Sequence, residues 1–200
     1  MKKPVNLAPP VRASHEIRII GGQWKRTKLP VRDMPGLRPT PDRVRETLFN
    51  WLGQDLAGWR CVDAFAGTGV LGLEAASRGA VEVTLVEHDR GLVEQITKTA
   101  ARLQASAVRV LRGDGVAALR QCAPGSVDLV FIDPPFDSEL FEPALRAALP
   151  ALSQRGLVYL EAPLAWTAEK LAPLGIALHR HLKAGAVHAH LLSRAHTVHA

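Results

Sequence analysis

The tetrapeptide Asp133-Pro134-Pro135-Phe136 combines residue types that could hold a planar, amine-bearing ring such as a nucleobase. It follows an apolar run, residues 127–132, that predicts a parallel strand buried on both faces. A carboxylate leaving such a strand at its carboxyl end lies where open α/β sheets bind ligands. The prolines lack N–H donors, so their carbonyls remain as free acceptors, and Phe136 adds a stacking face. The structural alternative is a strand-ending turn with a helix-capping aspartate.

A second group of candidate residues, Asp63, Phe65, Gly67 and Gly69, lies between a predicted strand and the helix that follows it. Glycines at this position let a ligand approach the backbone, and the helix N-terminus favours an anionic group. Glu87 stands 18 residues after Gly69, at the end of the next predicted strand. An acid at about that distance binds ribose hydroxyls in dinucleotide sites.

The ligand predicted for this second group is S-adenosylmethionine rather than NAD. The third glycine of the dinucleotide pattern is absent, and Asp63 inside the strand suits an ammonium group better than a pyrophosphate. S-adenosylmethionine has a carboxylate for the helix N-terminus, an ammonium for acids and a ribose diol for Glu87. Asp114, after the third strand, could accept from the adenine amine. Each acid could instead be a cap or turn residue, but four acids at consecutive strand ends favour a cofactor site.

The elements that must position these residues alternate from residue 60 onward. We expect helices at 70–78, 91–103, 116–121 and 140–149, and strands at 60–65, 81–86, 108–111, 127–132, 157–160, 176–182 and 187–193. Serial βα units of this kind predict a Rossmann-like, doubly wound α/β fold. We therefore expect a seven-stranded, mostly parallel sheet that ends in an antiparallel C-terminal edge hairpin.

The N-terminal quarter is organised differently from the rest. Residues 1–15 have the composition of a disordered tail, and 16–52 are expected to form a small extension before the domain at 53–200. Two β-prone runs around Gly21-Gly22 predict a hairpin, followed by a proline-rich loop at 30–41. Thr40-Pro41 predicts the N-cap and first position of an amphipathic helix from Asp42 to about Leu52, with Arg43 and Arg45 outside.

The excess positive charge of the chain lies in this quarter. Residues 1–50 carry 11 Lys and Arg against 4 Asp and Glu, whereas residues 51–200 carry 14 against 15. Such a segment on a near-neutral domain predicts a polyanionic partner, most simply nucleic acid, although a solvated basic arm is the alternative. The residues expected to contact RNA are Arg18, Trp24, Lys25, Arg26, Lys28, Arg38 and Arg43; Trp24 could equally pack the hairpin onto the domain.

Other classes of protein are disfavoured by what the sequence lacks. No apolar run approaches the roughly 20 residues of a membrane span, and no hydrophobic signal follows Met1. Cys61 and Cys122 lack metal or redox spacing, so we expect two buried thiols in a reducing cytosol. The pairs His179/His181 and His188/His190 could hold a metal, but no acid or cysteine joins them, so no metal site is predicted.

Two sequence segments resemble a known family. Asp63-Ala64-Phe65-Ala66-Gly67-Thr68-Gly69 together with residues 133–136 resembles class I S-adenosylmethionine-dependent methyltransferases of exocyclic amines. Arg18-Ile19-Ile20-Gly21-Gly22 and the segment from Leu37 to Leu52 are similar to the RsmD family, over about residues 16–193. That family is the bacterial 16S rRNA (guanine(966)-N(2))-methyltransferase. One departure is Arg26, near which the family has glycine, so the turn geometry there is open.

The resemblance implies that Asp133 and the Pro134 carbonyl hold the guanine amine while Phe136 stacks on the base. It also implies 16S rRNA, within a partly or fully assembled small subunit, as substrate of a cytoplasmic monomer that uses no metal. The tetrapeptide is shared with DNA adenine or cytosine methylases and with protein glutamine methylases. The former carry a large recognition region that this chain has no room for, and the latter favour Asn at position 133. A non-catalytic RNA-binding module would not need four strand-end acids.

Overall fold

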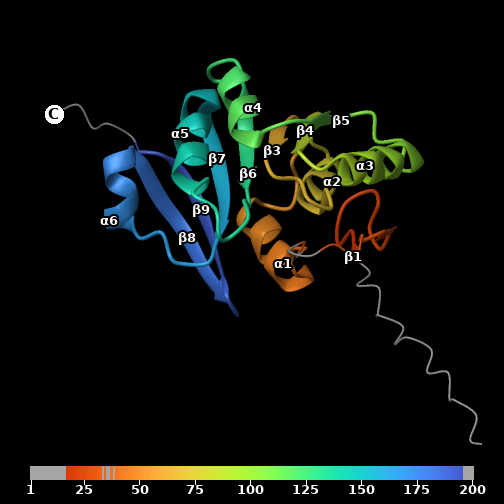
Figure 1. Ribbon diagram of the computed structural model, residues 1–200, viewed down its shortest axis with the longest axis horizontal. Coiled ribbons are helices and arrows are strands. Elements are labelled where there is room, and N and C mark those ends of the chain that lie inside the picture. The colour runs from red at the N-terminus through yellow and green to blue at the C-terminus, as the bar shows by residue number, and fades with distance from the viewer. Residues whose placement is uncertain (1–16, 33, 35–36, 38, 196–200) are drawn as a thin grey trace, which may run out of the picture.

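A seven-stranded sheet forms the centre of the computed structural model, which describes residues 17–32, 34, 37 and 39–195 (Figure 1). The strand order is β5-β4-β3-β6-β7-β9-β8, and β9 is antiparallel to both of its neighbours while the other pairs are parallel. The fold predicted from the strand–helix alternation is therefore confirmed. The strands are β3 (Arg60–Asp63), β4 (Glu82–Glu87), β5 (Val108–Arg112), β6 (Val127–Ile132), β7 (Leu152–Ala162), β8 (Ile176–Ala184) and β9 (Val187–Arg194).

Helices cover both faces of this sheet because its strands are apolar on both sides. Phe131 and Tyr159 point into a core shared with α1 (Asp42–Trp51), α2 (Val70–Ser77) and α3 (Arg90–Arg102). Val130 and Leu160, one residue along each strand, point into the opposite core. That second core includes α4 (Gly115–Gln121), α5 (Phe141–Ala151) and α6 (Ala168–Leu171), which is followed by the 3-10 helix η1 (Ala172–Leu174). No helix in the described part of the chain is long and apolar enough to cross a membrane.

Two differences from the expected elements have local causes. Strand β7 begins at Leu152, five residues before its predicted start, because Leu152 already pairs with Val127. The register then shifts across the polar run Ser153-Gln154-Arg155, so that Leu157 pairs with Leu129. Helix α6 and η1 were not predicted, since together they span only seven residues, 168–174. They are too short to show a helical period.

The N-terminal hairpin is present but is built differently from the prediction. Strands β1 (Ile17–Arg18) and β2 (Lys28–Leu29) pair antiparallel, and residues 19–27 connect them. The Gly-Gly pair is therefore not a two-residue turn; it packs against the last turn of α2. A Cβ on Gly22 would lie 1.8 Å from the carbonyl oxygen of Ser77. The indole of Trp24 is half-buried against the same core and so packs the hairpin onto the domain, whereas its contact with RNA stays a prediction.

Helix α1 departs from the prediction at its start and in one arginine. It begins at Asp42 with Pro41 at the N-cap, and no side chain caps it, so Thr40 is not the cap residue. Arg43 is exposed as predicted, but Arg45 is wholly buried, and the expectation that it lies outside is wrong. The cause is a buried carboxylate, Glu74 of α2, which lies 3.1 Å from Arg45. The predicted 1–15 tail and Arg38 lie outside the described residues.

Candidate active site

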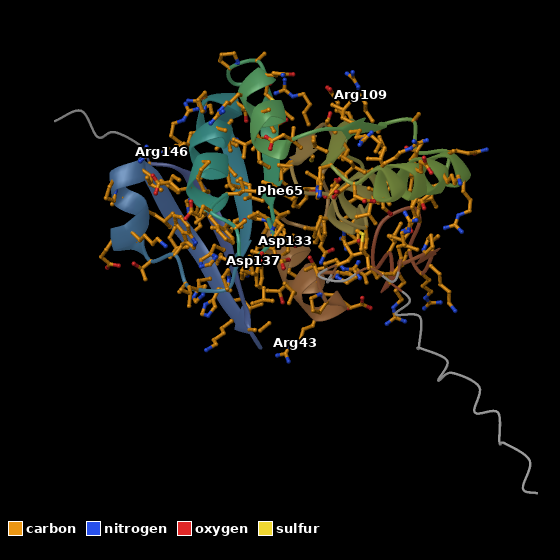
Figure 2. The ribbon with its side chains drawn as sticks, viewed as in Figure 1. Arg43, Phe65, Arg109, Asp133, Asp137 and Arg146 are labelled. Carbon is orange, nitrogen blue, oxygen red and sulfur yellow. The ribbon has the colours of Figure 1, made fainter. Side chains whose placement is uncertain are left out.

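Four carboxylates stand at or beside the carboxyl ends of adjacent strands. Asp63 ends β3, Glu87 ends β4, Asp133 follows β6, and Glu161 lies at the end of β7. The registers Asp63↔Phe131 and Ile132↔Leu160 bring the three acids of β3, β6 and β7 to one edge of the sheet. Asp133 and Phe65 lie near the centre of the molecule, between the two helical layers (Figure 2). This edge is the ligand position of open α/β sheets.

Asp63 is a buried carboxyl with one unsatisfied oxygen. Its Oδ2 accepts from the Gly72 N–H at 3.3 Å, whereas Oδ1 has no hydrogen-bond partner among the described residues. Burial raises the pKa of Asp63 to about 7, and the N–H groups of Gly72 and Phe65 only partly oppose the shift. A buried acceptor without a partner is costly to a fold, and a cationic ligand would remove that cost.

The loop between β3 and α2 is shaped by its two glycines and held by Glu87. Gly67 and Gly69 have φ values of 53° and 78°, in the left-handed region that side chains disfavour. The Gly67 N–H donates to Glu87 Oε2 at 2.8 Å, and the Asp89 N–H donates to Oε1 at 2.9 Å. Glu87 therefore joins the loop after β3 to the end of β4, and its carboxylate retains acceptor capacity for a ligand hydroxyl.

Asp114 lies next to this loop but has a structural task of its own. Its Oδ1 caps α4 by accepting from the Ala117 N–H at 2.7 Å. The Gly113 N–H donates to the Glu87 carbonyl at 3.0 Å, which fixes the Asp114 turn beside β4. The side chain is exposed, so the predicted contact with an adenine amine stays a prediction.

The loop after β6 keeps one free carbonyl, not two. The Pro135 carbonyl accepts from the Ser138 N–H at 3.0 Å, so the expectation that it is free is wrong. Among the described residues, no backbone N–H donates to the Pro134 carbonyl. Pro134 is buried and Phe136 is half-exposed, so the loop presents an acceptor and a ring on a rigid backbone.

Glu161 is a functional candidate that sequence reasoning missed. Its side chain is buried and accepts from the Tyr159 hydroxyl at 2.8 Å. Burial raises the pKa of Glu161, and hydrogen bonds from Thr40 and Tyr159 oppose the shift. Burial also raises the pKa of Asp133 well above its ordinary range, and the nearby Glu161 and Asp63 add to that. An acid directly after the apolar run 157–160 was a readable signal, the same one that singles out Asp133.

The remaining predicted residues gather on the α1–α3 side. Arg18, Lys25, Arg26, Lys28 and Arg43 are exposed, and Arg18 pairs with Asp42 at 3.1 Å. Cys61 is buried as predicted, whereas Cys122 is half-exposed, so the expectation of two buried thiols is wrong for Cys122.

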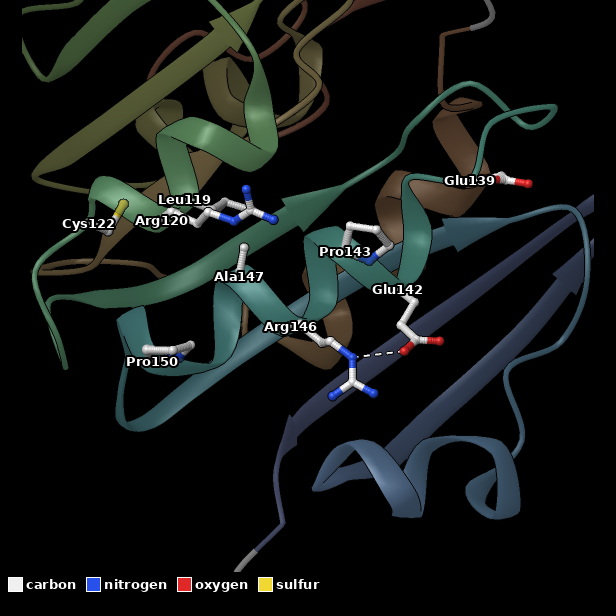
Figure 3. A pocket seen from close by; sticks show the side chains of 9 residues that line it. All are labelled: Leu119, Arg120, Cys122, Glu139, Glu142, Pro143, Arg146, Ala147 and Pro150. Atoms are coloured by element: carbon white, nitrogen blue, oxygen red, sulfur yellow. Dashed lines mark hydrogen bonds and ion pairs between the residues drawn. The ribbon is translucent and has the colours of Figure 1, made fainter.

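Two other features of the opposite half lie apart from this site. A cavity of about 580 Å³ opens between α4 and α5, where Glu142 pairs with Arg146 at 2.8 Å (Figure 3). None of the four strand-end acids lines it. His190 is fully buried between the Leu160 carbonyl and the Trp166 N–H, so it is a neutral structural residue rather than part of a half-exposed edge. Burial lowers its pKa to about 4.

The chain is similar to known proteins along almost its whole length. A family model described as "Conserved hypothetical protein 95" matches residues 17–193. Ribosomal RNA small subunit methyltransferase D of Escherichia coli is 43% identical over 196 residues, 97% of this chain and 96% of the relative. The Haemophilus influenzae protein of the same name is 39% identical over 84% of this chain and 94% of its own length.

Solved structures agree with the sequence relatives. The Escherichia coli protein yhhF, provisionally assigned as a methyltransferase, has a TM-score of 0.78 and 40% identity, over 90% of this chain and 98% of its own. With the sequence matches, this similarity shows that the chain belongs to the RsmD family of class I methyltransferases.

Proposed function

We propose that this protein transfers a methyl group from S-adenosylmethionine to the exocyclic N2 amine of a guanine in small-subunit ribosomal RNA. Relatives that are named small-subunit rRNA methyltransferases support the reaction and the substrate class. The observation that carries the choice of an amine acceptor is Asp133 at the end of β6, beside the free carbonyl of Pro134 and the ring of Phe136.

The residues on the cofactor side fit S-adenosylmethionine. The unsatisfied Asp63 Oδ1 suits the ammonium of the methionine moiety. Gly67 and Gly69 leave the backbone open at the start of α2, where the carboxylate would be bound. Glu87 would accept from the ribose hydroxyls, with Asp114 near the adenine amine and Phe65 beside the ring. When bound, this cofactor supplies an electrophilic methyl group on a sulfonium.

On the acceptor side, the chain orients a weak nucleophile. The lone pair of an exocyclic guanine amine is delocalised into the ring. Asp133 and the Pro134 carbonyl would accept its two N–H bonds and so hold the nitrogen in the geometry that frees this lone pair, which supplies much of the rate. Phe136 would stack on the base after it leaves its helix. Once nitrogen is methylated it must lose a proton, which the Asp133 carboxylate, or a water, would accept.

The segment 16–52 would serve as the RNA-facing part and 53–200 as the methyltransferase domain. Exposed cations at Arg18, Lys25, Arg26, Lys28 and Arg43 support this division. They would bind phosphates without reading sequence, so target choice would depend on RNA shape. The substrate proposed is 16S rRNA in a partly or fully assembled small subunit.

The test offers several acceptors to the same protein. Full-length protein and methyl-labelled S-adenosylmethionine are incubated with small subunits from a strain that lacks the modification, with plasmid DNA and with a release factor. We expect label only in rRNA, and N2-methylguanosine in the nucleoside digest by mass spectrometry. Label in DNA or in release factor, or a different methylated base, would overturn the proposal.

A further inference from the structure

A second basic feature lies on α3, outside the N-terminal segment. Gly91, Gln95, Lys98 and Arg102 recur three or four residues apart, so they share one face of this helix. This face forms one wall of a groove of about 380 Å³, and Pro30 and Arg32 line the other wall. The groove starts four residues after Glu87, at the cofactor end of β4, and follows α3 to its last residue.

Contacts between the two walls fix their spacing. The Arg102 guanidinium donates to the Lys28 carbonyl at 3.0 Å, and the Gln95 amide donates to the Pro30 carbonyl. The Arg32 guanidinium lies against the first turn of α3, where it occupies the space that a Cβ on Gly91 would take. These contacts bring the cations of α3 beside the exposed Lys28 of the hairpin.

The charge of the groove is strongly positive. Lys98 and Arg102 contribute two exposed cations from α3, and Arg32 contributes a third from the facing segment. The single acid of the lining, Glu94, is paired with Arg90 at 2.9 Å. A groove whose two joined walls carry guanidinium and ammonium groups matches the spaced monoanions of a sugar-phosphate backbone.

We propose that this α3 groove binds the phosphate backbone of the RNA substrate and extends the basic hairpin surface along the methyltransferase domain. The inference rests on the proposed function, because it assigns a second contact surface to the same RNA. Lys98 and Arg102 would each contact a phosphate. Arg32 would close the end of the groove nearest Glu87.

The test measures the salt dependence of binding to labelled poly(U), a single strand that reports phosphate contacts without a target sequence. The slope of log affinity against log salt is negative, and Lys98→Gln/Arg102→Gln should make it shallower by about 1.4. This is about 0.7 for each of two lost contacts on single strands. Lys98→Arg/Arg102→Lys should keep the wild-type slope. Arg120→Gln/Arg146→Gln removes the same charge from the opposite face of the sheet and should also keep it.

Two results on the salt slope would overturn the groove assignment, and a competition experiment gives a third. One is a wild-type slope in the Lys98→Gln/Arg102→Gln protein, and the other is an equal reduction of slope in the opposite-face control. If poly-L-glutamate displaces poly(U) from wild type but not from Lys98→Gln/Arg102→Gln, the groove binds an acidic protein instead. Rates of small-subunit methylation by wild-type protein are measured alongside. If wild-type protein methylates the subunit and the Lys98→Gln/Arg102→Gln protein binds poly(U) with the wild-type salt slope, the groove assignment is refuted and the proposed function stands.

Discussion

Arg45 of α1 and Glu74 of α2 form an ion pair with both side chains fully buried, Nη1 to Oε2 3.1 Å apart. Glu74 also accepts from the backbone N–H groups of Ile20 and Gly21, and Arg45 Nε donates to the Thr40 carbonyl. One carboxylate thus fastens the N-terminal segment to the helix that begins at the cofactor loop. Since Thr40 also bonds Glu161, the network reaches the edge of the sheet where Asp133 lies.

We expect Arg45→Met to destabilise the protein by about 3 kcal/mol, because it leaves Glu74 buried with less compensation. Arg78, 3.1 Å from Glu74, keeps the loss near the lower end of the range for broken buried pairs. Arg43→Met is the matched control, two residues away and exposed, and should change stability by no more than about 0.5 kcal/mol. Urea unfolding measures both. Equal effects of the two variants would show that the buried pair contributes nothing specific.

Asp133→Ala should reduce methyl transfer by at least about a hundredfold while leaving S-adenosylmethionine affinity nearly unchanged. The reason is that Asp133 would hold the acceptor amine, whereas Asp63 and Glu87 would hold the cofactor. Single-turnover transfer to small subunits and calorimetric titration of the cofactor separate the two effects. A large loss of cofactor affinity would move Asp133 to the cofactor side of the site.

Asp63 makes the folding stability of the ligand-free protein depend on pH. Its folded pKa of about 7 lies above the ordinary 3.8, so the folded state holds this proton more tightly than the unfolded chain. The resulting stability is fully present below pH 3.8 and is lost as pH rises through about 7. We expect wild type to lose roughly 2–4 kcal/mol more than Asp63→Asn across this window, at 1.36 kcal/mol per pKa unit. Denaturant titrations through the window test this, and parallel curves for the two proteins would contradict it.

Glu87→Ala should weaken S-adenosylmethionine binding by about 1–3 kcal/mol, the cost of leaving polar partners unpaired. The Gly67 and Asp89 N–H groups lose their acceptor in this variant, so part of the effect comes from the loop itself. Glu87→Gln keeps an oxygen acceptor and should recover part of the affinity. Calorimetry of both variants decides, and unchanged affinity in Glu87→Ala would refute the ribose assignment.

The sheet and its strand-end residues were predictable because their signals are local. An apolar run followed by an acid places Glu87 and Asp133 at strand ends without knowledge of any partner. Asp63 was predicted inside a strand that runs to residue 65, whereas β3 ends at Asp63. The Rossmann-like order of the strands then follows from the alternation with helices. Glu161, directly after the apolar run 157–160, carries the same signal but was not singled out.

The errors concern residues whose state depends on distant partners. Arg45 has the sequence position of an exposed helix residue, and only Glu74, 29 residues later, accounts for its burial. Gly21-Gly22 is typical of a turn locally, but Gly22 needs to be glycine because its φ is 72° and a Cβ there would clash with Ser77. Thr40 has the side chain of a helix cap but bonds Glu161, 121 positions further along the chain. No periodicity in the sequence encodes these pairings.

Two substitutions of Arg26 in the hairpin separate the effect of its backbone conformation from the effect of its charge. Its φ of 72° lies in the left-handed region, where a residue with a Cβ is strained and glycine is not. Arg26→Gly should therefore stabilise the protein by about 0.5–1 kcal/mol, whereas Arg26→Ala keeps the strain and should not. Both variants remove one exposed cation, so both should lower the salt slope of poly(U) binding by about 0.7 if Arg26 contacts a phosphate.

Adding Lys25→Ala and Lys28→Ala to either variant should lower the slope further, by about 0.7 for each phosphate that the protein no longer binds. The cofactor affinity should stay constant throughout, since the strand-end acids are untouched. If the salt slope of every variant equals that of wild type, the hairpin is a structural element that packs Trp24 onto the core. Phosphate binding would then depend on Arg43 and on the groove along α3.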